Sequence, residues 1–199
     1  SSDGAVVAMA ASGAKAGAPS GRRVLLLAAL AIVVIAVVAA VFFLLAPSGP
    51  REVRLEMYEF GFNGPTGGPA IRAKVGETIR IVLVNRGGAE HEFMVVGDKD
   101  GFLNALHQKI SELKAKGMGE DEIEKSEELE ELHHHYAAAM LMVGDKMEHD
   151  VVLERGETET VTLRFDRPGT YNYLCAELDL TFPETHADRG MYGTIVVEG

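Results

Sequence analysis

One loop near the C-terminus gathers three side chains that are suited to holding a soft metal ion. Cys175 is the only cysteine of the chain, and His186 and Met191 follow it. Cys175 ends the strand-like segment TYNYLC and Met191 begins MYGTIVVEG, so one strand-to-strand loop contains all three residues. A thiolate, an imidazole and a thioether are three of the four ligands of a trigonal His₂Cys copper site with a long axial Met. The missing ligand of such a site is a second histidine.

His91 is the candidate for that second histidine. It stands in NRGGAEHEFMVV, where a turn passes into a β-like run. Taken alone, each residue has an ordinary structural explanation: His91 as a polar residue at a strand start, and Cys175 as a buried core cysteine. Taken together with His186 and Met191, they predict one copper centre built at the ends of strands.

The segments around these residues are typical of strands. EVRLEMYEF and ETIRIVLVN alternate apolar with polar residues, and GFNGPTGGP between them is rich in turn formers. The pattern returns from Val151 onward in VVLERGETETVTLRF and in the two segments that flank the ligand loop. We therefore expect a domain over residues 52–199 that is a β-sandwich of seven or eight short strands.

A different pattern interrupts these strands. Residues 99–146 carry leucines and isoleucines at spacings of three and four, which predicts a helical insertion of two helices, the first capped by Asp100. The insertion contains His133, His134 and His135 and several methionines. It fits a structural cover over one edge of the sandwich, a labile second copper site, or a surface that docks a membrane complex.

The N-terminal part predicts a membrane anchor. Val24–Ala46 contains 23 residues without a charge, glycine or proline; as a helix it would extend about 34 Å, enough for a hydrocarbon core of about 30 Å. A cleaved signal peptide is the alternative, but its apolar core is normally shorter. We predict a disordered cytoplasmic tail over residues 1–21, an anchor helix over 22–46 and a short linker over 47–51. Arg22 and Arg23 place the N-terminus in the cytoplasm and the copper domain on the outer, extracellular or periplasmic side of a single-pass cell-membrane protein.

Charge narrows the class of partner. From Arg51 onward the chain has 16 Lys and Arg against 29 Asp and Glu, a net charge of −13. A nucleic-acid-binding domain needs a basic face, so the composition predicts no nucleic-acid partner. An acidic surface suits a cationic protein, although it also serves solubility.

The strand segments and the four candidate ligands resemble the cupredoxins, the small blue copper proteins such as plastocyanin and sulfocyanin. The resemblance covers about half of the chain, in three segments: AKVGETIRIVLVNRGGAEHEFMV, VVLERGETETVTLRFDRPGTYNYLC and HADRGMYGTIVVEG. It implies an all-β, Greek-key β-sandwich, to which the sequence pattern adds the helical insertion and one preceding transmembrane helix. It also implies that His91, Cys175, His186 and Met191 bind one type 1 copper, with Met191 as the axial ligand.

One feature departs from the small members of that family. Ten residues, AELDLTFPET, separate Cys175 from His186, where many small cupredoxins have only a few. Copper nitrite reductases resemble this chain in having a long ligand loop. In the family the second histidine faces the partner, so we expect electrons to pass through His186, with Phe182 and Pro183 either in the docking rim or packed onto the sandwich.

Two functions follow from the resemblance. The first is a membrane-anchored carrier of single electrons between respiratory or photosynthetic complexes, such as a cytochrome or an oxidase. The second is a copper chaperone or storage protein that supplies oxidase assembly. We expect no enzymatic activity, because a binuclear copper centre needs two bridging cysteines and the chain has one, and no nucleotide loop or Ser/His/Asp set occurs.

Overall fold

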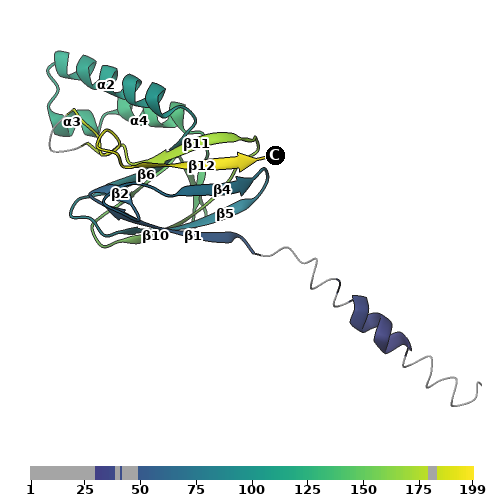
Figure 1. Cartoon of the computed structure of the whole chain (residues 1–199). Helices are drawn as coiled ribbons and strands as arrows, with labels where there is room; N and C mark the ends of the chain where they lie inside the picture. Colours follow the sequence, from purple (N-terminus) through teal and green to yellow (C-terminus); the bar gives the residue numbers. More distant parts are fainter. Residues whose placement is uncertain (1–29, 39–40, 42–48, 179–182) are drawn as a thin grey trace, which may run out of the picture. The chain divides into compact units, whose positions relative to one another are not determined.

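The computed structural model describes residues 30–38, 41, 49–178 and 183–199 (Figure 1). The chain divides into two compact units, residues 1–48 and residues 49–199.

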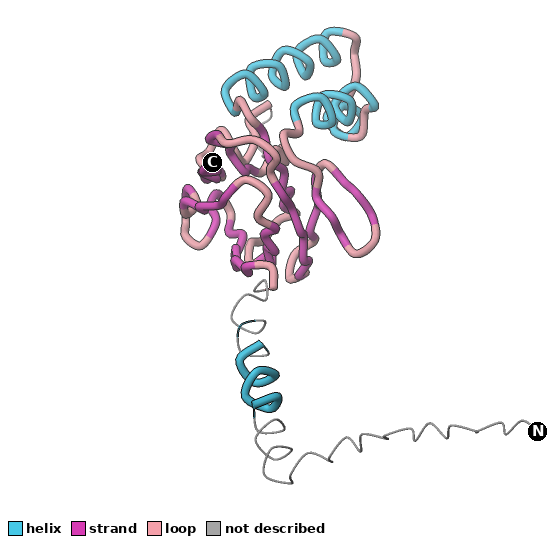
Figure 2. Tube along the Cα trace, turned by 90° about the vertical axis from the view of Figure 1, so that its right-hand side faces the viewer, coloured by secondary structure: helices cyan, strands magenta, loops and turns pink. Residues whose placement is uncertain are grey.

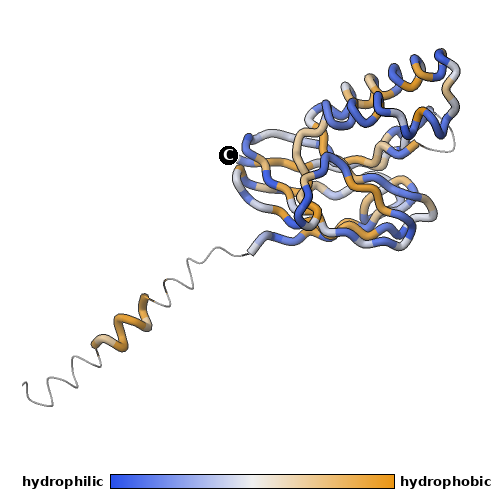
Figure 3. The backbone as a smooth tube through the Cα atoms, turned by 180° about the vertical axis from the view of Figure 1, so that it is seen from behind, coloured by the Kyte–Doolittle hydropathy of each residue, from blue (hydrophilic) through white to orange (hydrophobic). Residues whose placement is uncertain are grey.

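In the first unit, residues 30–38 form an exposed helical stretch that is hydrophobic throughout (Figure 3). Across the described ranges, no helix combines the length and the apolar composition that crossing a bilayer requires. The tail predicted for residues 1–21 lies outside the described residues, and so does most of the anchor predicted for residues 22–46. Both stay predictions.

The second unit is a sandwich of two sheets with helices inserted after the sixth strand (Figure 2). One sheet has the order β3-β2-β1-β5-β10-β7-β8 and the other the order β4-β12-β11-β6-β9. The strands described are β1 (Arg51–Tyr58), β2 (Phe60–Phe62), β3 (Thr66–Gly67), β4 (Ala70–Lys74), β5 (Thr78–Asn85), β6 (His91–Val96), β7 (Leu141–Val143), β8 (Lys146–Glu148), β9 (Asp150–Leu153), β10 (Thr158–Arg164), β11 (Gly169–Leu174) and β12 (Tyr192–Glu198).

The alternating segments form the long strands, as predicted. In β5 the buried residues Ile79, Ile81 and Leu83 recur every second position, because successive side chains point to opposite faces of a sheet. In the antiparallel β5–β10 pair, Val161 lies opposite Ile81 and Leu163 lies opposite Ile79, so both strands present one apolar face to the core. Pairs of this kind set the register of the sheet.

Strand β6 is buried along its whole length because the five-stranded sheet is covered on both faces. Phe93 and Val95 belong to the core between the two sheets, whereas Met94 and Val96 belong to a second core beneath the helices. Figure 1 shows the helices lying over the sheet that contains β6, β11 and β12. The insertion is therefore a structural cover, as one interpretation of its sequence proposed, but it covers the outer face of this sheet rather than an edge.

The insertion contains three described helices where the sequence predicted two. They are α2 (Lys99–Ala115), α3 (Glu120–Glu124) and α4 (Glu127–Tyr136). The N-cap of α2 is Asp98, whose carboxylate accepts the Gly101 N–H at 2.9 Å, and Asp100 lies in the first turn instead. Ser126 separates α3 from α4 because its hydroxyl caps the Leu129 N–H, which starts a new helix.

The helical prediction for residues 99–146 was wrong at its C-terminal end. Helix α4 ends at Tyr136, and Leu141–Val143 and Lys146–Glu148 form the hairpin β7–β8, which pairs with β10 at the sheet edge. Gly144 at φ 61° makes the two-residue turn, a conformation that glycine adopts without steric cost. The short strands β2, β3, β7 and β8 account for the excess over the seven or eight strands expected.

Candidate metal centre

The four predicted ligands lie at one end of the five-stranded sheet. His91 begins β6, Cys175 directly follows β11, and Met191 directly precedes β12. Strand β11 pairs with both β6 and β12, with Leu174 opposite Met94 and Tyr192. These pairings bring three strand ends together although they are far apart in sequence.

Three donor atoms converge to a spacing that suits a single metal ion. The Nδ1 atoms of His91 and His186 are 3.1 Å apart, and Cys175 Sγ lies 3.8 Å from the first and 3.4 Å from the second. A triangle with these sides has a circumscribed radius of about 2.0 Å, close to the length of a bond from a metal to nitrogen and slightly below that to sulfur. An ion in this plane would reach all three donors without rearrangement of the chain.

Met191 is held beside the other three residues by the backbone. Its carbonyl oxygen accepts the Cys175 N–H at 3.1 Å, and its own N–H donates to the carbonyl of His186 at 2.9 Å. The side chain is fully buried in the same core cluster as Cys175. The structure thus brings together all four residues predicted from the sequence.

His91 is positioned by a tight turn that sequence reasoning did not interpret. The buried Asn85 side chain donates to the carbonyl oxygens of Ala89 and Leu153, both at 2.9 Å, and accepts the Gly87 N–H at 2.9 Å. A Cβ atom at Gly87 would lie 2.4 Å from His91 Nε2, so only glycine leaves room for the imidazole. The signal was present in NRGG, which is an Asn followed two residues later by Gly.

The long ligand loop is fastened to the helical insertion. Asp188 Oδ2 accepts the N–H of Thr185 at 2.8 Å and its hydroxyl at 2.9 Å, and it lies 2.8 Å from His107 Nε2 on α2. Ala187, between these residues, packs into the core beneath the helices. The insertion therefore helps to fix the segment from which His186 reaches the centre.

Burial sets the protonation of the donors. Burial, and then the neighbouring His186, lower the pKa of His91 to about 4, so its imidazole is neutral at pH 7 and has a lone pair available for a metal. Burial raises the pKa of the Cys175 thiol, while the Glu92 N–H, which donates to Sγ at 3.3 Å, favours the thiolate. Metal binding would replace the thiol proton, which makes the affinity depend on pH.

Of the four predicted ligands, His186 is the nearest to solvent, at 5% exposure. It lines a surface hollow of about 250 Å³ together with Phe60, Leu178 and the carboxyl-bearing residues Glu59, Glu90 and Glu177. Its ring packs edge-on against Phe60 at 5.7 Å between centroids. Of the two residues expected near a docking rim, Pro183 is exposed and Phe182 lies outside the described residues.

A family model for copper-binding proteins of the plastocyanin/azurin family matches residues 68–198. This match includes all four converging residues and most of the chain. The chain belongs to the plastocyanin/azurin family. This cupredoxin family binds copper and carries electrons, and the soft, compact donor set described above fits one copper ion.

Solved structures of other copper proteins are similar to part of the chain at low sequence identity. A dithionite-reduced auracyanin from Roseiflexus castenholzii is 18% identical with a TM-score of 0.46, covering 76% of this chain and all of that one. Auracyanin B is 20% identical with a TM-score of 0.46, covering 77% of this chain and 94% of that one. A multicopper oxidase is 15% identical with a TM-score of 0.47 and covers 76% of this chain but 45% of that one. No curated protein sequence matches the chain.

Proposed function

We propose that this cupredoxin is a membrane-anchored carrier of single electrons that holds one type 1 copper with His91, Cys175, His186 and, as the axial ligand, Met191. The observation that carries the proposal is the buried triangle of two imidazole nitrogens and one cysteine sulfur, with a circumscribed radius of about 2.0 Å. Copper bound by such a set exchanges one electron between Cu(I) and Cu(II).

The role of the protein is to keep the donors in one arrangement and to exclude water. Cys175 and His91 are fully buried, and the Glu92 N–H donates to the sulfur, which lowers the electron density on the thiolate. The Asn85 turn fixes His91 and the Asp188 bonds fix the loop of His186. Donors fixed in this way need little movement when the charge of the site changes.

Electrons would enter and leave at the edge of His186. The hollow beside it contains Phe60 and Leu178, which suit a close apolar contact with a partner. Burial, and then a hydrogen bond with Glu124, raise the pKa of Glu177 to about 9, so this carboxyl is neutral at pH 7 and costs little to cover. The net charge of −13 of residues 51–199 as a whole favours a cationic redox partner of a respiratory or photosynthetic chain.

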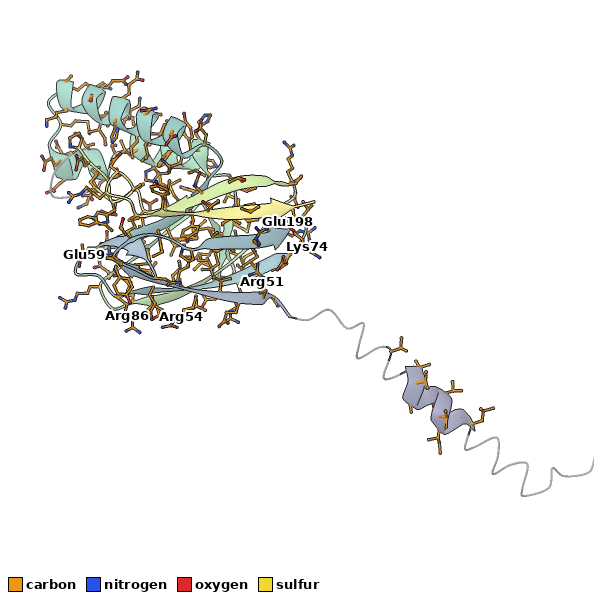
Figure 4. The ribbon with its side chains drawn as sticks, viewed as in Figure 1. Arg51, Arg54, Glu59, Lys74, Arg86 and Glu198 are labelled. Atoms are coloured by element: carbon orange, nitrogen blue, oxygen red, sulfur yellow. The ribbon has the colours of Figure 1, made fainter. Side chains whose placement is uncertain are left out.

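The hollow lies at the end of the domain away from the start of its first strand (Figure 4). Figure 4 shows Glu59, which lines the hollow, at the end of the sandwich opposite to Arg51, where β1 begins. We propose no enzymatic activity, because the residues assigned to the centre already supply all four ligands of an electron-transfer copper.

The decisive experiment is the visible and electron paramagnetic resonance spectrum of the full chain in detergent after loading with Cu(II). The carrier should show an intense thiolate-to-copper band that bleaches on reduction and returns on reoxidation, and Cys175→Ser should abolish it. Met191→Leu should shift the band and the reduction potential, whereas Met142→Leu, at an exposed methionine of β7, should change neither. Weak absorption that is unchanged by Cys175→Ser would refute the blue-copper assignment.

A chelator separates the carrier from the copper chaperone. Because the donors are buried, the carrier should retain copper against a mild chelator in both oxidation states. Rapid loss of Cu(I) to the chelator, with a normal blue spectrum beforehand, would favour copper delivery instead.

A further inference from the structure

A second group of metal-binding side chains lies on the opposite face of β6, beneath the helices. Glu92 of β6, His133 of α4 and Asp150 at the start of β9 each direct one donor atom to a common point, and these atoms all lie within 4.8 Å of one another. None of the three is a member of the copper centre. They come from three separate elements, so the group exists only in the folded protein.

The spacing of these donors matches that of a metal site. His133 Nδ1 lies 3.3 Å from Glu92 Oε1 and 3.3 Å from Asp150 Oδ2. Four donors placed tetrahedrally at zinc-bond lengths of 2.0–2.1 Å are separated by about 3.3–3.4 Å. Both measured edges therefore have the length expected between two ligands of one ion.

One buried oxygen of this cluster has no hydrogen-bond partner among the described residues. A histidine Nδ1 carries at most one hydrogen, and here its geometry directs that hydrogen to Asp150 Oδ2. Glu92 is 3% exposed, and its Oε1 atom, at the same distance from Nδ1, has no hydrogen-bond partner in the described structure. A buried carboxylate oxygen without a donor is costly, and a bound cation would satisfy it.

The charges of the cluster also favour a cation. Burial alone would lower the pKa of His133, but the charges of Glu92 and Asp150 outweigh it and raise this pKa to about 10. Glu92 and Asp150 thus stabilise the imidazolium proton of His133. A divalent ion bound to the neutral imidazole would take the place of that proton.

We propose that Glu92, His133 and Asp150 form a second metal site, which binds a divalent cation of the Zn²⁺ type. One imidazole and two carboxylates are ligands that suit zinc, whereas the copper centre supplies a soft thiolate. The side chains of His133 and Asp150 are 15% and 21% exposed, so the ion can enter from solvent and keep a water as its fourth ligand. His149 is not counted among the donors, because its Nε2 pairs with Glu130 at 3.0 Å.

The two sites would be close neighbours. The N–H of Glu92 donates to Cys175 Sγ while its side chain belongs to the second site, so one residue contacts both. The ion would also tie α4 to β6 and β9, and so secure the cover over the five-stranded sheet.

The test measures zinc binding with the copper centre disabled. Zn²⁺ is titrated into the full chain carrying Cys175→Ala, in competition with a chromophoric zinc indicator, and the same titration is made after adding His133→Gln. We expect the proposed site to bind one zinc ion per chain. After His133→Gln this ion should bind at least about 100-fold more weakly, because loss of a direct ligand should exceed the 10–100-fold cost of losing an outer-shell partner. Zinc held by the remaining His91 and His186 would be unaffected by His133→Gln and serves as the background.

His135→Gln is the matched control, since His135 is an exposed histidine of the same helix. It should leave zinc binding unchanged. Circular dichroism verifies the fold of each variant, and Asp150→Asn, at a partly exposed position, provides a second test should His133→Gln unfold. Absence of zinc binding in Cys175→Ala, or binding that neither His133→Gln nor Asp150→Asn weakens, would overturn the proposal.

Discussion

Gly87 packs so closely against the imidazole of His91 that a single methyl group should disturb the copper centre. The Cβ atom of Gly87→Ala would lie 2.4 Å from His91 Nε2 and 3.1 Å from Cδ2, whereas ordinary contact begins at 3.4 Å. Gly87 does not adopt a positive φ, so alanine brings no backbone strain of its own. The effect must come from side-chain contacts, chiefly that with the ring and to a smaller degree that with Asn85 Oδ1 at 3.3 Å.

The size of the effect follows from these distances. The ring must retreat by about 1 Å to restore ordinary contact. Overpacking of a buried site costs about 1–3 kcal/mol, which lowers the unfolding midpoint by about 3–10 °C in a domain of this size. A shift of about 1 Å is half of a metal–nitrogen bond of about 2.0 Å, so the bond from His91 should lengthen or break and the copper affinity should fall at least tenfold.

The assay compares the copper spectrum, the copper affinity and the thermal unfolding of Gly87→Ala with those of Gly88→Ala. At Gly88 the nearest atom to the new Cβ is Glu59 Oε1 at 3.0 Å, the end of a flexible side chain that can move away. The free energy of unfolding of Gly88→Ala should stay within about 0.5 kcal/mol of that of the parent chain, because alanine also lowers the entropy of the unfolded state. Identical spectra and midpoints for the two variants would refute the view that Gly87 positions His91.

Three further predictions concern the supports of the site. Asp188→Asn replaces a carboxylate that accepts two hydrogen bonds from Thr185 with an amide that can also donate. The unfolding midpoint should fall by about 3–10 °C and the copper spectrum should broaden. An unchanged spectrum would show that these bonds do not hold the His186 loop. Burial raises the pKa of Glu177 to about 9 in the folded protein, above its unfolded value, so ionisation opposes folding increasingly as pH rises from about 4.5 to 9. In thermal melts across pH, Glu177→Gln should therefore gain stability over the parent chain through that range and show no gain below it; a constant difference would contradict the assignment. Ser126→Ala removes the N-cap of α4 and should cost about 0.5–2 kcal/mol in denaturant unfolding, whereas no loss would mean that packing alone starts the helix.

Local pattern predicted the part of this protein that local chemistry controls. The period-2 alternation of ETIRIVLVN predicts a strand with one buried face, and this segment forms β5 in the structure. The convergence of Cys175, His186 and Met191 was predictable because they share one loop, and His91 was predicted as the missing histidine because it stands at the start of a strand-like segment. The short hairpin at 141–148 was missed because its three-residue strands carry little periodicity, and only the Gly144–Asp145 turn marked it.

Other features depend on residues that are distant in sequence. Asn85 and Gly87 support His91 only because β9 supplies the Leu153 carbonyl beside them. Glu92 looks like an exposed position in the sequence HEFMVV, yet the helical insertion buries it next to His133, a contact between residues 41 positions apart. No periodicity within either segment predicts the contact between Glu92 and His133.

The sequence by itself determined the donor types, the strand ends that carry them, the apolar N-terminal segment and the acidic balance, because residue chemistry and side-chain periodicity are local properties of the chain. Only the fold determined the radius of the donor triangle, about 2.0 Å, the placement of the buried His186 beside a surface hollow, and the packing of the insertion on the sheet. These depend on strand order and on which faces are covered, and pairing between distant strands is fixed by the cooperative packing of both cores rather than by any one segment.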